Sequence, residues 1–410
     1  MDYLISTIVN LHKRDREDWA ASFIELEKGW YRRARCYAVI NCIPRIYLSI
    51  VLSSMVSSSF LVCLLLVANR LCTQIQANMD AGVKGTIDLM PLKLEDLTVS
   101  GLSSGAYMAV QMHVSHSRAI NGSAVFAGGP FYCAESNLEY AEHKCMDNEL
   151  GYPETEKLVG LTRTDAAMAL VDDPDVHMKN DRIYLFSGKD DTVVKQTVAQ
   201  SLRSYYEAFT ASSNIVVEFN VEAEHCIPTL DQGVPCTTLA SPYIGLCHFD
   251  GAGHALDTLY RESRQGFKLP EKEVRAELTK AQESNLFSFD QTPYYLQDGL
   301  SSLGDVGYIY IPTACQDGKT TCRLHVSFHG CEQNLDKIGN EYALNAGFNA
   351  HAEANNIVVL YPYAKVSNVV PFNPKGCWDW WAYTGVYYGT KKGIQIEFVR
   401  KIIERLGIIV

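Results

Sequence analysis

The chain has 410 residues, of which 47% are hydrophobic and 20% are charged, an ordinary globular composition with enough length for a sizeable core. Its formal net charge is −11, which excludes the clustered basic character of a typical nucleic-acid-binding protein. No C-x-x-C pair and no cysteine–histidine cluster with zinc spacing occurs, so we expect no metal site. We also expect no organic cofactor.

Two segments come before the part of the chain with globular character. Residues 1–46 are polar to mixed, with a basic cluster, and residues 47–68 contain no charged side chain. The uncharged run is long enough to span a bilayer, and the basic residues before it predict a cytoplasmic N-terminus. A secretory signal peptide that starts at Met55 and is cleaved near Ala77 is the alternative, and a core helix is a third interpretation.

Both favoured interpretations of this segment place the bulk of the chain outside the cytosol, either secreted or anchored by a single membrane span. Residues 69–90 are then a linker. The sequon that begins at Asn121 predicts N-glycosylation and fits that location.

Cysteine usage agrees with an oxidising compartment. Nine cysteines follow residue 90, and several are near neighbours in sequence, which favours short-loop disulfides. Nine is odd, so at least one thiol is free or pairs elsewhere. The near neighbours are Cys133 and Cys145, Cys236 and Cys247, and Cys315 and Cys322.

Residues 91–410 are predicted to form one α/β domain, in which a mostly parallel sheet of about eight strands carries helices on both faces. Residues 226–300 are expected to be irregular apart from one helix. Strands are expected at 97–100, 123–127, 182–187, 214–221, 307–312, 323–328 and 357–361. Helices are expected at 106–116, 194–211, 272–283, 341–355 and 395–406.

The motif GLSSG at 101–105 stands between the first of these strands and the first helix. This is the G-x-S-x-G pattern of a nucleophile elbow, in which Ser103 would occupy a strained turn with its hydroxyl in a cleft. The flanking glycines leave room for neighbouring backbone, and the backbone N–H of Ser104 would stabilise an oxyanion. A plain Gly/Ser-rich turn is the alternative, but the strand and helix on either side favour a nucleophile.

An acyl-transfer serine needs a base and an orienting carboxylate, which follow it in the chain order Ser, Asp, His in α/β-hydrolases. Asp191 follows the strand at 182–187 at the end of a Gly-x-x-Asp turn and is favoured over its neighbour Asp190. His225 follows the next strand, where the base is expected, and is favoured over His248 and His254.

A second oxyanion donor is expected in the loop that begins His329-Gly330-Cys331, after the strand at 323–328. This loop comes about 230 residues after the serine, whereas it precedes the serine in the ordinary hydrolase order. The helix at 395–406 has the character of the segment that should lead into the elbow strand. Joining the C-terminus to residue 90 would restore the ordinary order, so the sheet is predicted to be circularly permuted.

Five motifs together resemble the extracellular polyhydroxybutyrate (PHB) depolymerases of the single-domain, circularly permuted α/β-hydrolase type. They lie at 99–108, 184–194, 224–229, 325–333 (HVSFHGCEQ) and 373–385 (NPKGCWDWWAYTG). The resemblance implies a serine esterase acting on PHB or its oligomers, with Ser103, Asp191 and His225 as the triad. It also implies the backbone N–H groups of Ser104 and Cys331 as the oxyanion hole.

The resemblance further implies a Cys331–Cys377 disulfide and at least one tryptophan of the 377–381 segment in the substrate cleft. We expect the aromatic residues of this region to bind substrate, although core packing is the alternative for about half of them. The substrate-binding candidates are Trp378, Trp380, Trp381 and Tyr383.

Two other functions remain open at this point. A general secreted carboxylesterase for feruloyl, acetyl or other small esters would use the same site. A catalytically silent recognition domain on a hydrolase scaffold is the alternative from a different class. The expected partner is a polyester or small ester, with no nucleic acid.

Overall fold

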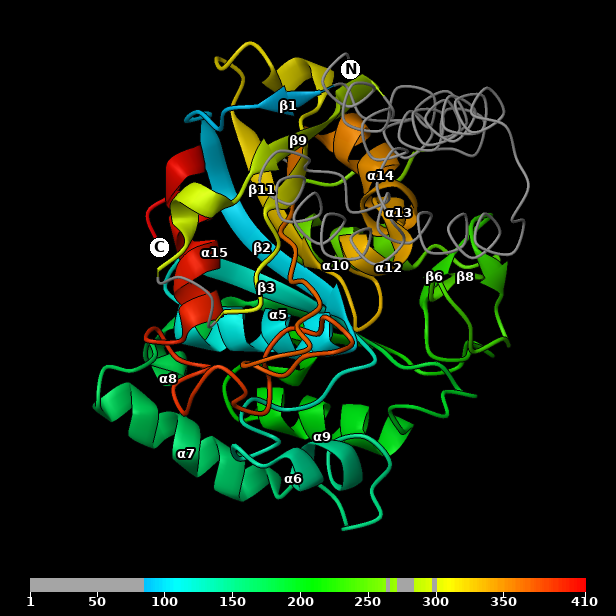
Figure 1. Cartoon of the computed structure of the whole chain (residues 1–410), viewed down its shortest axis with the longest axis vertical. Coiled ribbons are helices and arrows are strands. Elements are labelled where there is room, and N and C mark those ends of the chain that lie inside the picture. Colours follow the sequence, from blue (N-terminus) through cyan, green and yellow to red (C-terminus); the bar gives the residue numbers. More distant parts are fainter. Residues whose placement is uncertain (1–84, 263–265, 271–283, 297–300) are drawn as a thin grey trace, which may run out of the picture. The chain divides into compact units, whose positions relative to one another are not determined.

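The computed structural model describes residues 85–410, apart from 263–265, 271–283 and 297–300 (Figure 1). The extension at 1–46, the uncharged segment at 47–68 and the helix expected at 272–283 lie outside these ranges. No helix within the described ranges is both long and apolar enough to cross a membrane.

A nine-stranded sheet forms the centre of the described part, in the order β1-β9-β10-β12-β11-β2-β3-β4-β5. All neighbouring pairs are parallel except the two that β10 makes, which are antiparallel. The mostly parallel sheet of the prediction is therefore confirmed. Its strands are β1 (Thr86–Ile87), β2 (Leu94–Leu102), β3 (Ile120–Phe126), β4 (Arg182–Phe186), β5 (Ile215–Glu218), β9 (Leu286–Asp290), β10 (Val306–Tyr310), β11 (Cys322–Phe328) and β12 (Ile357–Tyr361).

Side chains alternate along each strand between two apolar layers, because successive residues of a strand point to opposite faces. In β4, Tyr184 and Phe186 pack on one side, whereas Ile183 and Leu185 pack on the other. The first face is covered by α10 (Gly251–Tyr260), α13 (Glu341–Asn345) and α14 (Phe348–Asn355). The second is covered by α5 (Ser104–Ser115), α7 (Thr155–Ala167), α9 (Gln196–Glu207) and α15 (Ile394–Leu406).

Several elements differ from the sequence prediction. The helix expected at 341–355 is divided into α13 and α14, because Gly347 adopts a left-handed conformation (φ 92°) between them. The stretch expected to be irregular contains α10 and a small sheet, whose strands of two or three residues are too short to show alternation. That sheet consists of β6 (Ile227–Thr229), β7 (Val234–Pro235) and β8 (Ile244–Leu246).

Four further helices were also not predicted: α6 (Leu138–His143), α7 (Thr155–Ala167), α8 (Pro174–His177) and α12 (Leu335–Ile338). At the start of the described residues, β1 pairs with β9. Residues 85–90, which we expected to be linker, therefore already belong to the folded part.

The end of α15 lies directly beside the start of β2, which confirms the circular permutation. The backbone N–H of Leu92 donates to the carbonyl of Leu406 at 2.8 Å. Gly407 ends α15 in the left-handed conformation (φ 112°) that often terminates a helix. In the sheet, β11 pairs with β2 although more than half of the described chain separates them. The loop after β11 is therefore brought to the elbow that follows β2.

Candidate active site

Ser103 occupies a strained turn between β2 and α5. Its backbone (φ 57°, ψ −121°) is in a region that few residues with a side chain adopt. A Cβ on Gly101 would lie 2.1 Å from the carbonyl oxygen of Gly105, and a Cβ on Gly105 would lie 2.2 Å from that of Phe328. Both glycines are therefore required by close backbone contacts, which is the physical basis of the motif.

Asp191 and His225 form a buried pair. Oδ2 of Asp191 lies 2.9 Å from Nδ1 of His225, and each residue is 6% exposed. Oδ1 of Asp191 accepts hydrogen bonds from the backbone N–H groups of Val193 and Val194, both at 2.8 Å. The carboxylate is thus fixed by its own loop and orients the imidazole so that Nε2 is left for another partner.

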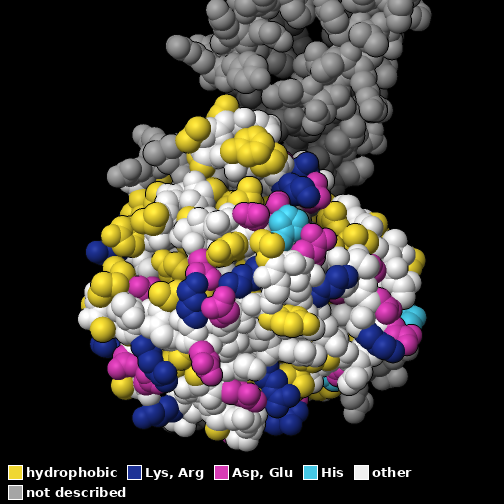
Figure 2. All heavy atoms as spheres, turned by 90° about the horizontal axis from the view of Figure 1, so that it is seen from below, with side chains coloured by type: hydrophobic (Ala, Val, Ile, Leu, Met, Phe, Trp, Pro, Cys, Tyr) yellow, Lys and Arg dark blue, Asp and Glu magenta, His cyan; other side chains and the backbone are white. Residues whose placement is uncertain are grey.

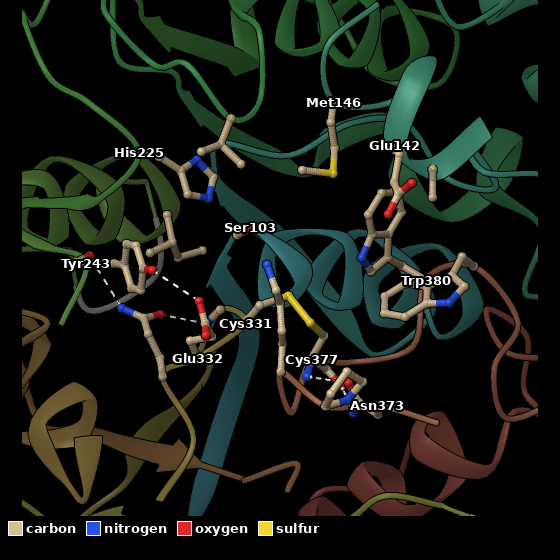
Figure 3. Close-up of a pocket in the computed structure, with 18 of the residues that line it drawn as sticks. Ser103, Glu142, Met146, His225, Tyr243, Cys331, Glu332, Asn373, Cys377 and Trp380 are labelled. Atoms are coloured by element: carbon tan, nitrogen blue, oxygen red, sulfur yellow. Dashed lines mark hydrogen bonds between the residues drawn. A yellow bond between two sulfur atoms is a disulfide. The ribbon is translucent and has the colours of Figure 1, made fainter. Parts of the chain in front are cut away.

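Ser103 and His225 line the same cavity of about 450 Å³. Figure 3 shows the imidazole of His225 turned toward Ser103, with Cys331 on the adjoining wall. The three alternatives that the sequence left open are elsewhere. Asp190, His248 and His254 are exposed to solvent, and none of them lines this cavity.

The loop after β11 is built around a buried, neutral His329. Burial lowers the pKa of His329 to about 4. Its Nδ1–H donates to the carbonyl of Gly330 at 2.7 Å, and its Nε2 accepts from the N–H of Ala364 at 3.1 Å. A neutral imidazole is needed for this pair of contacts, since a protonated ring could not accept the second one.

Two backbone N–H groups are available next to Ser103. Ser104 is the first residue of α5, where helix N–H groups lack an intrahelical partner. The N–H of Cys331 donates no hydrogen bond within the described residues. A Cβ on Gly330 would lie 3.3 Å from Cβ of Ser103, so this loop packs directly against the elbow.

A disulfide joins Cys331 to Cys377, as the resemblance implied. The three pairs of cysteines that are near neighbours in sequence are also bonded: Cys133–Cys145, Cys236–Cys247 and Cys315–Cys322. Cys226 is the free thiol among the described residues, and its burial raises its pKa to about 12. It is therefore a packed thiol and not a thiolate nucleophile.

The four aromatic candidates divide into two groups. Trp380 and Trp381 line the cavity, and Trp380 stacks on Tyr107 with ring centroids 4.0 Å apart. Trp378 is fully buried and packs edge-to-face on Phe328. The hydroxyl of Tyr383 donates to the carbonyl of Cys377 at 2.6 Å, and Tyr383 is not among the residues that line the cavity. Trp378 and Tyr383, which we expected to bind substrate, therefore do not line this cavity, because both pack away from it.

Asp379 explains why adjacent aromatic residues face different ways. Its carboxylate, which is 1% exposed, accepts from the backbone N–H groups of residues 381–384. These bonds coil the segment tightly around one side chain. As a result, Trp378 on one side of Asp379 packs in the core, and Trp380 on the other side lines the cavity.

Comparison with known proteins identifies the family. No family model matches the chain. The chain is 39% identical over 331 residues to poly(3-hydroxybutyrate) depolymerase of Delftia acidovorans, which covers 79% of this chain but 63% of the relative. It is 34% identical over 315 residues to polyhydroxybutyrate depolymerase of Talaromyces funiculosus, covering 74% of this chain and 87% of the relative. The chain belongs to the PHB depolymerase family.

Solved structures of PHB depolymerases share the fold. One is a serine-to-alanine variant complexed with an R3HB trimer (TM-score 0.68, 30% identity), matched over 78% of this chain and 98% of that one. Another is the PHB depolymerase from Penicillium funiculosum (TM-score 0.67, 31% identity), matched over 79% and 99%.

Among the residues that line the cavity of this PHB depolymerase homologue, those outside the five sequence motifs had no signal in the sequence. They come from short helices and loops whose positions are set by disulfides and by packing, not by any local pattern. The apolar ones are Leu138, Ala141, Met146, Leu239 and Phe372, and the polar or charged ones are Glu142 and Tyr243. The proximity of Cys133 and Cys145 in the sequence was the one feature that indicated a disulfide restraining the segment between them.

Proposed function

We propose that this protein is a serine esterase that hydrolyses the ester bonds of PHB or its oligomers outside the cytosol. One observation carries the proposal: the buried Asp191–His225 pair and Ser103, on its strained elbow, meet at one cavity. The names of the relatives and of the solved complex support a hydroxybutyrate ester as the substrate.

In the proposed reaction, Oγ of Ser103 attacks the ester carbonyl while Nε2 of His225 takes its proton. The same proton then passes to the departing alkoxide, which leaves as an alcohol, and an acyl-enzyme remains. Water, activated by His225, releases the acid. Asp191 holds the ring and stabilises the imidazolium. The N–H groups of Ser104 and Cys331 stabilise the oxyanion, and such a donor contributes about 3–4 kcal/mol in a serine protease.

The cavity suits a chain that is apolar between its ester groups. Its volume is within the usual range for small-molecule sites, and most of its walls are apolar. The faces of Trp380 and Trp381 offer apolar contact with polar N–H edges, which matches alternating hydrocarbon and ester segments.

Four disulfides support function in an oxidising compartment, and therefore a secreted or otherwise extracytoplasmic domain. Glycosylation at Asn121 remains a prediction. The side chain of Asn121 is exposed near the start of β3, at the end of the strand opposite to the elbow.

The deciding experiment compares the full chain with its Ser103→Ala variant on a suspension of amorphous PHB and on p-nitrophenyl butyrate. We expect clearing of the polymer and hydrolysis of the small ester, with kcat reduced at least about 10³-fold in the variant. Hydrolysis of the small ester alone would instead indicate a general carboxylesterase. A folded protein that hydrolyses neither and does not react with a fluorophosphonate probe would be a silent recognition domain.

A further inference from the structure

Lys375 is the one lysine or arginine among the residues that line the cavity. Within the described part of the chain, no carboxylate lies in ion-pair range of its ammonium group. We propose that Lys375 binds the terminal carboxylate of an acid-ended hydroxyalkanoate oligomer and so directs hydrolysis to the ester next to that end. This inference rests on the proposed function of the same cavity.

The backbone of Lys375 is held firmly beside the oxyanion loop. Its carbonyl accepts hydrogen bonds from the N–H of Glu332 at 2.8 Å and from Nδ2 of Asn334 at 3.0 Å. Two residues further on, Cys377 is joined by its disulfide to Cys331. The loop therefore fixes where the lysine side chain starts, while the exposed ammonium remains free to meet a ligand.

The other charges in the cavity do not neutralise Lys375. Glu332 already accepts from the hydroxyl of Tyr243 at 3.2 Å, and it lies 3.9 Å from the ammonium of Lys337. Leu138, Ala141 and Glu142 of α6 form one wall of the cavity, which we call the α6 wall. In Figure 3, Glu142 lies beside Trp380, across the cavity from Glu332.

The rest of the molecule offers an anion little attraction. The chain carries a net charge of −11, and positive and negative side chains are interspersed over the face shown in Figure 2. A carboxylate is therefore attracted by a local positive charge and not by a broad field, and Lys375 supplies such a charge inside the cavity.

The chemistry of the substrate supplies the matching anion. Every ester within a hydroxybutyrate chain is neutral, but a free oligomer ends in one carboxylate, which is ionised at neutral pH. A short hydrocarbon link separates this carboxylate from the nearest ester, so both groups fit in one cavity. An ion pair here favours oligomers with a free acid end over interior polymer esters and over esterified ends, and the leaving group is then the terminal hydroxy acid.

The test is a selectivity ratio: kcat/KM for the 3-hydroxybutyrate trimer as the free acid, divided by kcat/KM for its methyl ester. We expect Lys375→Met to lower this ratio about 3- to 10-fold, mainly through KM for the acid, because partly exposed ion pairs are modest. Lys375→Arg should retain most of the preference. Lys365→Met is the matched control, since Lys365 pairs with Asp305 at 3.3 Å and does not line the cavity.

An unchanged ratio in Lys375→Met, or an equal loss on both trimers, would overturn the inference. If that variant folds poorly, the same selectivity ratio is measured with the wild-type protein at increasing salt concentration. Raising the ionic strength should lower the ratio, because the ion pair is screened. A ratio that does not depend on salt would also overturn the inference. Failure of the proposed function is a separate result, in which the wild-type protein hydrolyses neither trimer nor p-nitrophenyl butyrate.

Discussion

At the scale of single residues, Asp191 uses both carboxylate oxygens for different purposes. Oδ1 accepts from two N–H groups of its own loop, and Oδ2 accepts from Nδ1 of His225. The first contact fixes the carboxylate, and the second fixes the tautomer and direction of the imidazole. The neighbouring Asp190 has the same chemistry but is exposed, so position alone separates the two.

Asp191→Asn should lower kcat for p-nitrophenyl butyrate by about 10³- to 10⁴-fold, with KM changed only a few-fold. The amide cannot accept at both ends, so His225 would be held in the wrong tautomer or left without its partner. Asp190→Asn is the matched control and should keep nearly full activity. Comparable losses in both variants would contradict the role assigned to Asp191.

At the scale of elements, the α6 wall of the cavity is tied to the helix that carries the nucleophile. Tyr107, in the first turns of α5, donates from its hydroxyl to the carbonyl of Cys145 at 2.5 Å and stacks on Trp380. The Cys133–Cys145 disulfide closes the segment that contains α6. The wall, the tryptophan and the elbow therefore form one packed unit.

Removing this disulfide with Cys133→Ser and Cys145→Ser should destabilise the protein by about 2–3 kcal/mol and raise KM for the trimer several-fold. The loop gains entropy when unfolded, and the α6 wall loses its restraint when folded. Thermal unfolding and oligomer kinetics measure the two effects.

The matched control is removal of Cys315–Cys322, a short-loop disulfide at the start of β11, which does not line the cavity. It should lower Tm while leaving KM near the wild-type value. Equal changes of KM in both double variants would mean that α6 does not shape the site.

At the scale of the whole molecule, several histidines are buried in neutral form. Burial lowers the pKa of His116 to about 4, of His325 to about 3 and of His329 to about 4. In the unfolded chain each would titrate near 6.5. Between these values the unfolded state binds more protons than the native state, so stability rises with pH there and falls as the pH decreases.

We therefore expect Tm to be nearly constant just above pH 6.5 and to fall as the pH decreases from about 6.5 toward 4, with each histidine contributing on the order of 1–3 kcal/mol. A series of thermal unfolding curves measures this. His325→Gln should flatten the slope, because glutamine keeps polar contacts with Thr98 and Ser100 but does not titrate. His254→Gln, at an exposed position, should leave the slope unchanged. An equally steep slope in His325→Gln would exclude its contribution.

The sequence by itself determined the features that depend on local pattern. The elbow follows from a short motif between a strand and a helix, and the mostly parallel sheet follows from apolar strands that alternate with helices. The displaced oxyanion loop predicted the permutation, which the contact between Leu92 and Leu406 confirms. The resemblance supplied the Cys331–Cys377 pairing.

Only the tertiary structure decided which way individual side chains face. Trp378 and Trp380 are two positions apart in one motif, yet the first is in the core and the second in the cavity, because Asp379 coils the chain between them. The α6 wall and Lys375 reach the cavity through disulfides and long-range packing. No local pattern encodes such placements, since they depend on which distant segments meet, whereas the elbow is recognisable from a pattern of five consecutive residues.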